Sequence, residues 1–273
     1  MCTYGCVFFD SSTFIVVFVM FRDLLKPYVP MRFLDDESYR DRHLRVINAL
    51  LGREVLGVHT PDVKRIAKEL SANAKHWLDC LEAGDSEVLS YEEILLWGFL
   101  INFEKCSLEC RLWRLSRYVP VLDNWAVCDA FCAHAKWVKS DNRVRVWEFV
   151  SRYFLSKREF EVRFAVVFSM SYFLDEEYLS LVFQCVDGLC FDEIESEYIC
   201  SVPKSSGGQV GVVSGVSPYY VRMGVAWLLA TSLSKFPDET RAFVRRSHLP
   251  DDVVRLYVRK ARESFRTHEM SAM

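Results

Sequence analysis

Apolar side chains recur along most of the chain every three to four residues or so, which is the period of one face of an α-helix. Segments with this spacing follow one another at short intervals, and the connections between them have the length usual between packed helices. The pattern predicts helices over Val63–Leu70, Ile94–Ile101, Val144–Phe154, Val162–Phe173, Val221–Leu233 and Val253–Ala261. We therefore expect an all-α protein.

Signals for helix starts stand in front of several of these segments. Thr60–Asp62 combines a capping hydroxyl, a proline for the first turn and an acid that interacts favourably with the helix dipole. Ser90 with Glu93, and Ser156 with Glu159, both have the spacing of a capping box, in which each side chain accepts a backbone N–H of the other residue. These signals support the helix assignment and predict where the helices begin.

The helices recur as pairs of about 35–40 residues, the size of a HEAT-type helical hairpin. Stacked hairpins of this kind form an α-α superhelix (solenoid) with an extended concave face, and we expect one such domain over 21–273. A single compact helical bundle is the alternative. Residues 201–217 are rich in Ser, Gly and Val and predict a loop between two helices.

The first 20 residues form an N-terminal extension of uncertain status. Its apolar run from Phe14 to Phe21 is too short to span a bilayer, and it lacks the basic region and cleavage site of a secretory signal. Met20 would make an equally sensible start of the chain. We expect no membrane association.

Charge changes the picture only locally. The formal net charge is −3, so the chain as a whole has no bulk attraction for polyanions. Basic residues nevertheless outnumber acidic ones in 136–163 and in 222–273, whereas acidic residues dominate 164–221. A nucleic-acid site would therefore have to be a local basic face.

Ten cysteines are present, and two pairs have the i,i+4 spacing that places both thiols on one helix face: Cys106 with Cys110, and Cys128 with Cys132. The spacing falls inside the window of structural zinc sites, but both pairs sit among apolar residues without the turn residues of a zinc knuckle. We interpret them as buried core thiols, predict no metal site, and expect a reducing, cytoplasmic environment.

Three positions could carry chemistry. Trp125 and Asp129 stand one helical turn apart behind Asp123 and Asn124, either of which could cap the helix, so an aromatic ring would lie beside a carboxylate. A core tryptophan with a salt-bridged Asp129 is the structural alternative. Arg163 can pair with Glu159 along its helix, which makes it unremarkable alone.

Arg222 is the only charged residue between Ser217 and Leu233, and a cation in the first turn opposes the helix dipole. Either a protein carboxylate or a bound phosphate should compensate it. Trp227 follows on a stretch flanked by Gly and Ala, which another molecule could approach closely.

The chain resembles the DNA alkylation repair glycosylases of the AlkD type, which are built from HEAT-like helical repeats. The resemblance covers about residues 25–264, and the Trp-x-x-x-Asp helix followed by the Arg…Gly-x-Ala-Trp helix is its most specific part. The matching stretches are GVHTPDVKRIAKEL (57–70), DNWAVCDAFC (123–132), the helix of Arg163, and YVRMGVAWLLATSLSKFPDET (220–240).

The resemblance implies a monomeric, monofunctional hydrolase, nucleoid-associated when bound, that excises cationic N3- and N7-alkylated purines from double-stranded DNA without a metal or other cofactor. It assigns Asp129 as the catalytic carboxylate, Trp125 and Trp227 as the aromatic pair beside it, and Arg163 as a contact to the DNA backbone. Arg222 lies where related sequences also carry a basic residue. The acidic overall balance, the 201–217 segment and Cys128 depart from the family pattern.

Two other functions remain open at this point. A related helical-repeat protein could recognise DNA structure or damage without cleaving the glycosidic bond, or the same solenoid could serve as a protein–protein scaffold. The sequence does not specify the preferred alkyl adduct.

Overall fold

The computed structural model describes residues 21–198 and 218–270, and within them the fold is helical. No strand forms in these ranges, apart from an isolated bridge between Arg158 and Glu195. The chain divides into two compact units, Met1–His134 and Ala135–Met273. The expectations for the extension 1–20 and the loop 201–217 lie outside the described residues, and one domain over 21–273 stays a prediction.

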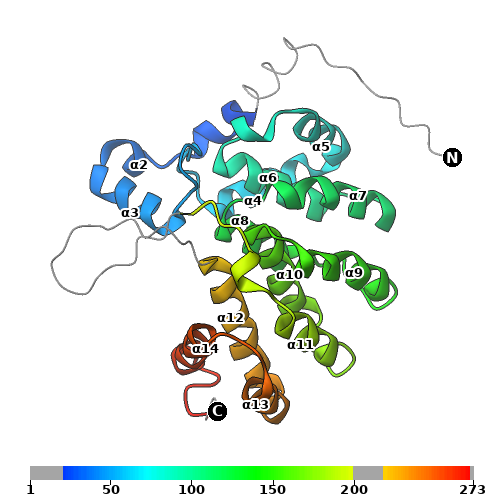
Figure 1. Ribbon diagram of the computed structural model, residues 1–273. Coiled ribbons are helices and arrows are strands. Elements are labelled where there is room, and N and C mark those ends of the chain that lie inside the picture. The colour runs from blue at the N-terminus through cyan, green and yellow to red at the C-terminus, as the bar shows by residue number, and fades with distance from the viewer. Residues whose placement is uncertain (1–20, 199–217, 271–273) are drawn as a thin grey trace. The chain divides into compact units, whose positions relative to one another are not determined.

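In the first unit, helices pack in series (Figure 1). Its α-helices are α2 (Met31–Asp35), α3 (Glu37–Ile47), α4 (Thr60–Leu70), α5 (Ala74–Ala83), α6 (Tyr91–Phe103), α7 (Leu108–Tyr118) and α8 (Trp125–His134). Helix α6 contacts α4 and α8, and it is also covered by α5 and α7. Because neighbours surround it, α6 is buried along almost its whole length.

The second unit repeats this arrangement. Its α-helices are α9 (Arg143–Val150), α10 (Glu159–Tyr172), α11 (Leu179–Asp187), α12 (Tyr219–Lys235), α13 (Pro237–Arg246) and α14 (Asp251–Glu263). Helix α12 packs between α10 and α14, while α9 lies against α10 and α13 against α12. The helices that lie between two others, α10 and α12, are again the most buried ones of the unit.

The predicted helix segments lie in helical structure, except that Phe173 is the C-cap after α10 and one segment changes helix type. Val144–Phe154 was expected as a single helix, but α9 ends at Val150 and a 3₁₀ turn over Ser151–Leu155 continues the segment. Such tightening is common at the C-terminal end of an α-helix, where the last carbonyls lack partners. The apolar spacing does not distinguish the two helix types here.

The two predicted capping boxes have different outcomes. Ser90 and Glu93 form one at the start of α6, as predicted. The prediction for Ser156 and Glu159 is wrong, because α10 begins at Glu159 itself and Arg158 precedes it without a side-chain cap. The Glu159 carboxylate instead accepts the backbone N–H of Tyr220 at 2.5 Å, at the start of α12. Glu159 therefore binds the N-terminal end of the neighbouring helix α12 and does not form the cap that its spacing from Ser156 predicts.

A buried carboxylate fixes the loop in front of α4. Glu92 of α6 is fully buried and accepts the backbone N–H groups of Leu56 at 2.8 Å, Gly57 at 2.7 Å and Val58 at 3.2 Å. Gly57 has φ +94°, a conformation that glycine adopts without strain. Burial raises the pKa of Glu92 to about 7, although the three N–H donors act in the opposite direction.

A glycine brings α7 and α8 close to α6. A Cβ atom at Gly98 would collide with the hydroxyl group of Tyr118 and would lie 3.4 Å from the ring of Phe131. Phe131 belongs to α8, so the absence of a side chain at position 98 helps to set how deeply α8 packs. This matters for the candidate site, because α8 carries Trp125 and Asp129.

Candidate functional site

The N-terminal end of α8 is held against the C-terminal end of α3. Asn124 precedes the helix, and its side-chain oxygen accepts the N–H of Ala126 at 2.8 Å, so Asn124 acts as the cap. The Asn124 amide group donates to the carbonyl of Ile47 at 3.0 Å, and the indole N–H of Trp125 donates to the same carbonyl at 3.1 Å. The last carbonyls of α3 thus fix the orientation of the Trp125 ring.

A buried ion pair supports this junction. Arg53 donates from Nε to the Asp123 carboxylate at 2.7 Å, and both side chains are almost fully buried. The same guanidinium also donates to backbone carbonyls of the segment before α6: those of Ser86 at 2.9 Å, Glu87 at 3.2 Å and Leu89 at 2.6 Å. The residues in front of α8 are therefore tied to two other loops of the first unit.

Trp125 and Asp129 lie on the half-buried face of α8. The buried face of this helix consists of Val127, Cys128, Phe131 and Cys132. Trp125, Ala126, Asp129 and Ala130 occupy the other side and are partly exposed. The two residues are one turn apart on this side of the helix, and direct contact between the indole and the carboxylate stays a prediction.

Arg163 lies in the interior of the second unit. It is 5% exposed, and its Nη1 donates to the carbonyl of Tyr220 at 2.5 Å, with the guanidinium 5.9 Å from the centroid of the Tyr220 ring. The side chain also lies close to Gly224 of α12, where a Cβ atom would be in ordinary van der Waals contact with that Nη1 atom, at 3.5 Å. Arg163 thus joins α10 to the first turns of α12.

Glu159 completes this anchor. Its carboxylate accepts from Tyr220 N and more distantly from Val221 N, and it also accepts from the Ser196 hydroxyl group. Burial raises its pKa, while these hydrogen bonds and the charge of Arg163 act in the opposite direction. A carboxylate at a helix N-terminus interacts favourably with the dipole, so Glu159 stabilises the start of α12.

Arg222 is compensated within the protein. It is 8% exposed, its Nη1 lies 2.9 Å and 3.0 Å from the two carboxylate oxygens of Asp252 in α14, and Asp192 is 3.8 Å from its Nη2. The guanidinium also lies over the ring of Phe191 at 4.9 Å. Of the two kinds of compensation expected for this cation, the structure contains the protein carboxylate. A DNA contact by Arg163 or Arg222 stays a prediction.

Trp227 is the most accessible of the predicted residues. It is 40% exposed and belongs to a narrow stripe on α12 that includes Tyr219, Met223 and Thr231, each one turn from the next. Arg259 of α14 lies 3.9 Å from the sulfur of Met223. The exposed indole of Trp227 and the exposed guanidinium of Arg259 therefore lie along the same stripe.

Arg255 and Arg259 were missed as individual candidates by the sequence analysis, which identified only a basic excess in 222–273. Both are exposed on α14, one turn apart, and their i,i+4 spacing within DDVVRLYVRKARE could have indicated a common face. Arg259 shares this surface with Glu263, 3.7 Å away. Surface arginines of this kind can approach a phosphate, which a buried guanidinium cannot do without local opening.

The five predicted residues fall into two groups. Trp125 and Asp129 are close together in the first unit, and Arg163, Arg222 and Trp227 lie on α10 and α12 of the second unit. That all five form a single site stays a prediction.

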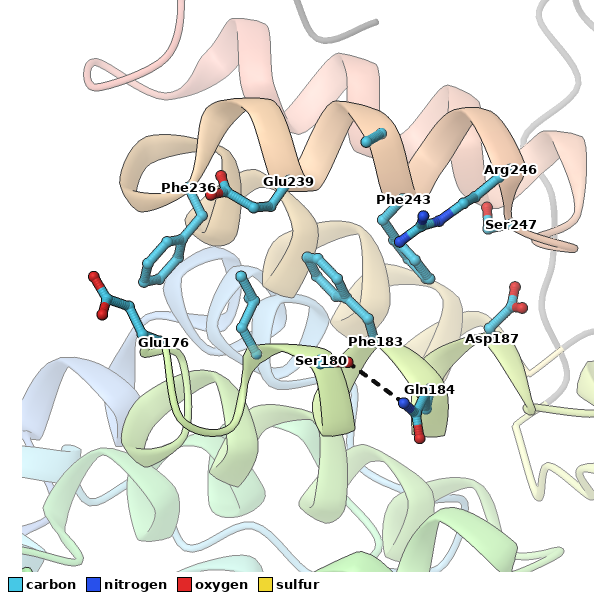
Figure 2. A pocket seen from close by; sticks show the side chains of 12 residues that line it. Glu176, Ser180, Phe183, Gln184, Asp187, Phe236, Glu239, Phe243, Arg246 and Ser247 are labelled. Carbon is cyan, nitrogen blue, oxygen red and sulfur yellow. Dashed lines mark hydrogen bonds between the residues drawn. The ribbon is translucent and has the colours of Figure 1, made fainter.

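A groove between α11 and α13 contains none of these residues (Figure 2). Its volume is about 620 Å³, and Phe183 and Phe243 are stacked in it with ring centroids 4.3 Å apart. Glu176, Asp187 and Glu239 add acidic groups to its lining, against the single cation Arg246. This lining does not suit a DNA backbone.

The two cysteine pairs differ in burial. Cys128 and Cys132 are fully buried in α8, as predicted. The prediction is wrong for Cys106 and Cys110, which are only partly buried. Cys106 lies in the loop between α6 and α7 and Cys110 in the first turn of α7, so helix packing does not cover them as it covers the interior face of α8.

Within 21–198 and 218–270, no helix is both long and apolar enough to cross a lipid bilayer.

Comparison with known proteins identifies the family. The sequence model of the DNA alkylation repair enzyme family matches residues 38–195, more than half of the chain. This range includes α8 with Trp125 and Asp129, and also α10 with Arg163. Neither the curated proteins nor the solved structures provide a match. The chain belongs to the family of DNA alkylation repair enzymes.

Proposed function

We propose that the protein is a monofunctional DNA glycosylase that hydrolyses the N-glycosidic bond of cationic N3- or N7-alkylated purines in duplex DNA. The observation that carries this proposal is the position of Asp129. It lies one helical turn after Trp125 on the half-buried face of α8, within the region that matches the DNA alkylation repair family. Family membership already gives the coarser statement, an enzyme that repairs alkylated DNA.

The chemistry requires little from the protein beyond electrostatics. A purine alkylated at N3 or N7 carries a positive charge and leaves the sugar as a neutral base, so no general acid is needed. Positive charge then develops on the deoxyribose. A carboxylate beside C1′ stabilises this charge and can orient the attacking water, and we assign that role to Asp129.

Trp125 and Trp227 would provide the aromatic walls of the site. The face of an indole ring attracts a nearby cation, and it excludes water that would otherwise screen the carboxylate. The hydrogen bond from Trp125 to the Ile47 carbonyl holds one ring in place, while Trp227 stands exposed on α12. We propose that the helices continue as one solenoid that places both rings at the same lesion.

Arg163 and Arg222 would support this site indirectly. Their hydrogen bonds to Tyr220 and Asp252 hold α12, and α12 carries Trp227. We propose that these two arginines position the helix, and that exposed residues such as Arg255 and Arg259 contact phosphates. We further propose that the protein acts as a monomer and without a catalytic cofactor, in the cytoplasm.

The test is release of free base from a duplex that contains 7-methylguanine, measured by chromatography. We expect the wild-type protein to release the base and Asp129→Asn to do so about 100- to 1000-fold more slowly, since one aligned electrostatic group is lost. Asp141→Asn, which alters an exposed aspartate of the second unit, is the matched control and should retain full activity.

Binding to the same duplex at several salt concentrations separates the other two functions. Salt-dependent binding without base release would support a damage-recognition protein that does not cleave DNA. A folded wild-type protein that neither binds nor cleaves would support a protein–protein scaffold.

A further inference from the structure

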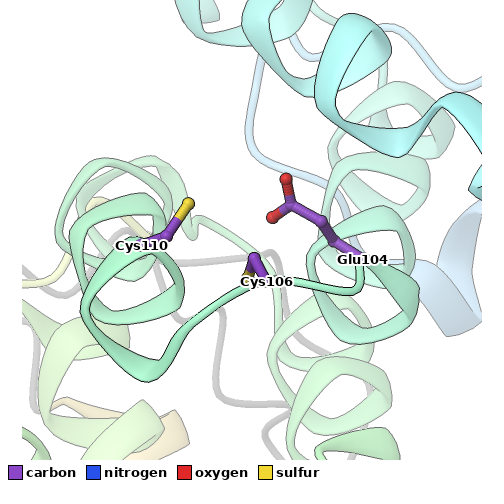
Figure 3. Close-up of side chains that lie close together, drawn as sticks. All are labelled: Glu104, Cys106 and Cys110. Carbon is purple, nitrogen blue, oxygen red and sulfur yellow. The ribbon is translucent and has the colours of Figure 1, made fainter. Parts of the chain in front are cut away.

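The loop that joins α6 to α7 brings three metal-binding side chains together. Glu104 is the C-cap residue directly after α6, Cys106 lies in the loop, and Cys110 stands in the first turn of α7 (Figure 3). One carboxylate oxygen and the two sulfur atoms all lie within 4.8 Å of one another. In a tetrahedral zinc site with Zn–S distances near 2.3 Å, two sulfur ligands are roughly 3.8 Å apart, so small side-chain rotations are sufficient.

The backbone that carries these side chains is fixed from both ends. Arg111 donates to the carbonyls of Ile101 and Glu104 and so holds the last turn of α6. Ser107 is the cap of α7, and its hydroxyl group accepts the N–H of Cys110 at 3.2 Å. An ion therefore does not have to order a free loop when it binds, which favours affinity.

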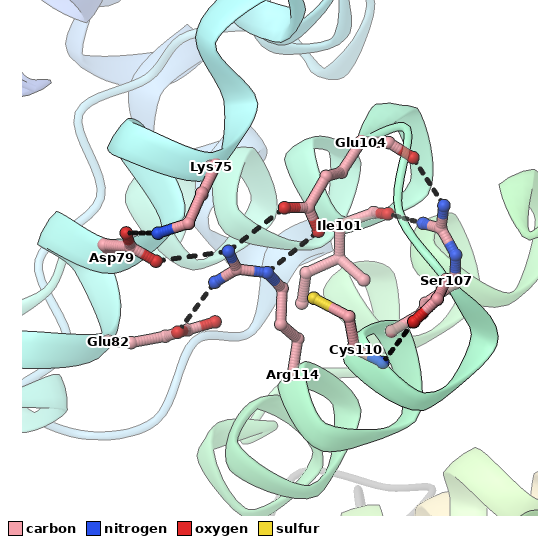
Figure 4. Close-up of polar contacts among 9 residues, drawn as sticks. Lys75, Asp79, Glu82, Ile101, Glu104, Ser107, Cys110 and Arg114 are labelled. Atoms are coloured by element: carbon pink, nitrogen blue, oxygen red, sulfur yellow. Dashed lines mark hydrogen bonds and ion pairs between the residues drawn. The ribbon is translucent and has the colours of Figure 1, made fainter. Parts of the chain in front are cut away.

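The carboxylate is oriented by a second arginine. Arg114 donates to Glu104 from Nε at 2.8 Å and from Nη2 at 3.0 Å (Figure 4). The same guanidinium also contacts Glu82 at 2.8 Å and Asp79 at 3.1 Å. A carboxylate has about four lone-pair directions, so Glu104 keeps positions for a metal while Arg114 holds it. Ligating carboxylates are usually hydrogen-bonded in this way.

The charges around the cluster suit a divalent ion. Two thiolates and Glu104 would carry three negative charges, of which a divalent ion neutralises two. The remaining negative charge lies beside two cations: Arg114, which contacts Glu104 and also Glu82 and Asp79, and Arg111, which holds the loop.

The cluster is accessible from solvent. Glu104, Cys106 and Cys110 line one part of an open cavity of about 920 Å³, and Lys75, His76 and Asp79 line another part. An ion can therefore enter without unfolding, and water can occupy a fourth position on the metal. Asp79 pairs with Lys75 and Arg114 and is not one of the three side chains whose ligand atoms lie within 4.8 Å of one another, so we do not assign it as a ligand.

We propose that Cys106, Cys110 and Glu104 form a binding site for a thiophilic divalent ion, Zn²⁺ in the first instance, with water as the fourth ligand. Thiolate ligands favour zinc over the oxygen-preferring ions Mg²⁺ and Ca²⁺. On binding, the two S–H bonds break, two metal–sulfur bonds form, and two protons pass to solvent. The ion would link α6 to α7 on a surface that the proposed glycosylase chemistry does not use.

The experiment is a titration of the reduced, metal-free full chain with Zn²⁺ in competition with a chromophoric chelator. We expect one ion per chain at this site, and Cys106→Ser and Cys110→Ser should each weaken its binding by about 100-fold or more. Cys190→Ser replaces an exposed cysteine of the second unit and is the matched control, with unchanged affinity expected. Absence of binding, or equal affinity in all three variants, would overturn the proposal.

A second measurement needs no variant, in case a substitution prevents folding. Alkylation of the wild-type chain is followed peptide by peptide with mass spectrometry, with and without Zn²⁺. We expect Zn²⁺ to slow alkylation of Cys106 and Cys110 at least tenfold while Cys190 reacts at the same rate. Protection of other cysteines instead, or of none, would contradict the site.

Discussion

Two regions of the molecule place their charged residues differently. One is the half-buried face of α8, which carries Asp129. The other is the anchor between α10 and α12, which contains Arg163 and Arg222. Asp129 shares a half-buried helix face with Trp125 and remains accessible. The two arginines are at most 8% exposed, and their hydrogen bonds hold Tyr220 and Asp252. In the sequence all three nevertheless look alike, because each is a charged residue with apolar residues on both sides.

The difference teaches that burial separates a charge that supports the fold from one that is available to a substrate. A buried ion pair costs desolvation free energy and becomes strongly destabilising if one partner is removed. A half-buried carboxylate loses less solvation and can still interact with a ligand. We therefore expect substitutions in the α10–α12 anchor to lower stability, and substitutions on the half-buried face of α8 to lower activity.

We expect the largest effect on stability at Glu92, which lies in the same unit as Asp129 but is a fully buried carboxylate. Its pKa is raised from 4.5 to about 7 in the folded protein, so the unfolded chain releases this proton first as the pH rises. The stabilising contribution of the protonated group is complete below about pH 4.5 and is lost by about pH 7. Relative to Glu92→Gln, the wild type should lose roughly 2–3 kcal/mol of unfolding free energy across this window.

Urea unfolding at several pH values measures this loss. A stability difference between wild type and Glu92→Gln that does not change with pH would show that Glu92 has an ordinary pKa. Burial would then not explain the difference that we expect between Glu92 and the half-buried Asp129.

Replacement of Arg222 should lower stability by less. Arg222→Met leaves Asp252 without its partner, but Asp252 is partly exposed, so we expect a loss of about 1–3 kcal/mol in unfolding free energy. Arg158→Met is the matched control, because it removes an ion pair with Glu161 in which the arginine is half exposed, and it should cost less than about 1 kcal/mol. A large loss of DNA affinity in Arg222→Met with unchanged stability would break the comparison, since Arg222 would then contact DNA.

Substitution of Trp227 should lower activity more than stability, as on the half-buried face of α8, although Trp227 lies in the second unit. Trp227→Ala removes an indole that is 40% exposed, and we expect base excision to slow about tenfold while unfolding free energy changes by less than about 1 kcal/mol. Trp113 in α7 is exposed to a similar extent, 42%, and Trp113→Ala should leave excision unchanged. Equal rates for the two variants would remove Trp227 from the site.

The smallest effect is expected for a surface arginine. Arg259→Ala should weaken duplex binding about two- to fivefold and reduce the slope of log affinity against log salt by about one, as expected for one lost phosphate contact. Fluorescence anisotropy at a series of salt concentrations measures both quantities. An unchanged slope would place the DNA on another surface.

Helix type and most helix positions could be predicted from the sequence because apolar spacing and capping residues are local signals. Ser90 with Glu93 shows this, since both partners of the capping box lie within one turn. Glu159 shows the limit, because its carboxylate accepts hydrogen bonds from the N-terminus of α12, which lies about 60 residues further along the chain. Nothing in the spacing of Ser156 and Glu159 reveals that competitor.

The candidate site could be predicted in part for the same reason. The neighbourhood of Trp125 and Asp129 follows from helix geometry, whereas the burial of Arg222 depends on α14 covering that side of α12. The two cysteine pairs have identical spacing but different exposure, because one lies on the packed face of α8 and the other spans a loop and a helix start. Tertiary packing decides such cases.

The most direct test of the central claim compares Asp129→Asn with wild type under single-turnover conditions on a duplex containing 7-methylguanine. The account predicts that excision falls at least about 100-fold, while duplex affinity and unfolding free energy stay within about twofold and 1 kcal/mol of wild type. Excision at the wild-type rate by a folded Asp129→Asn protein would contradict it, because the carboxylate would then not take part in the chemistry.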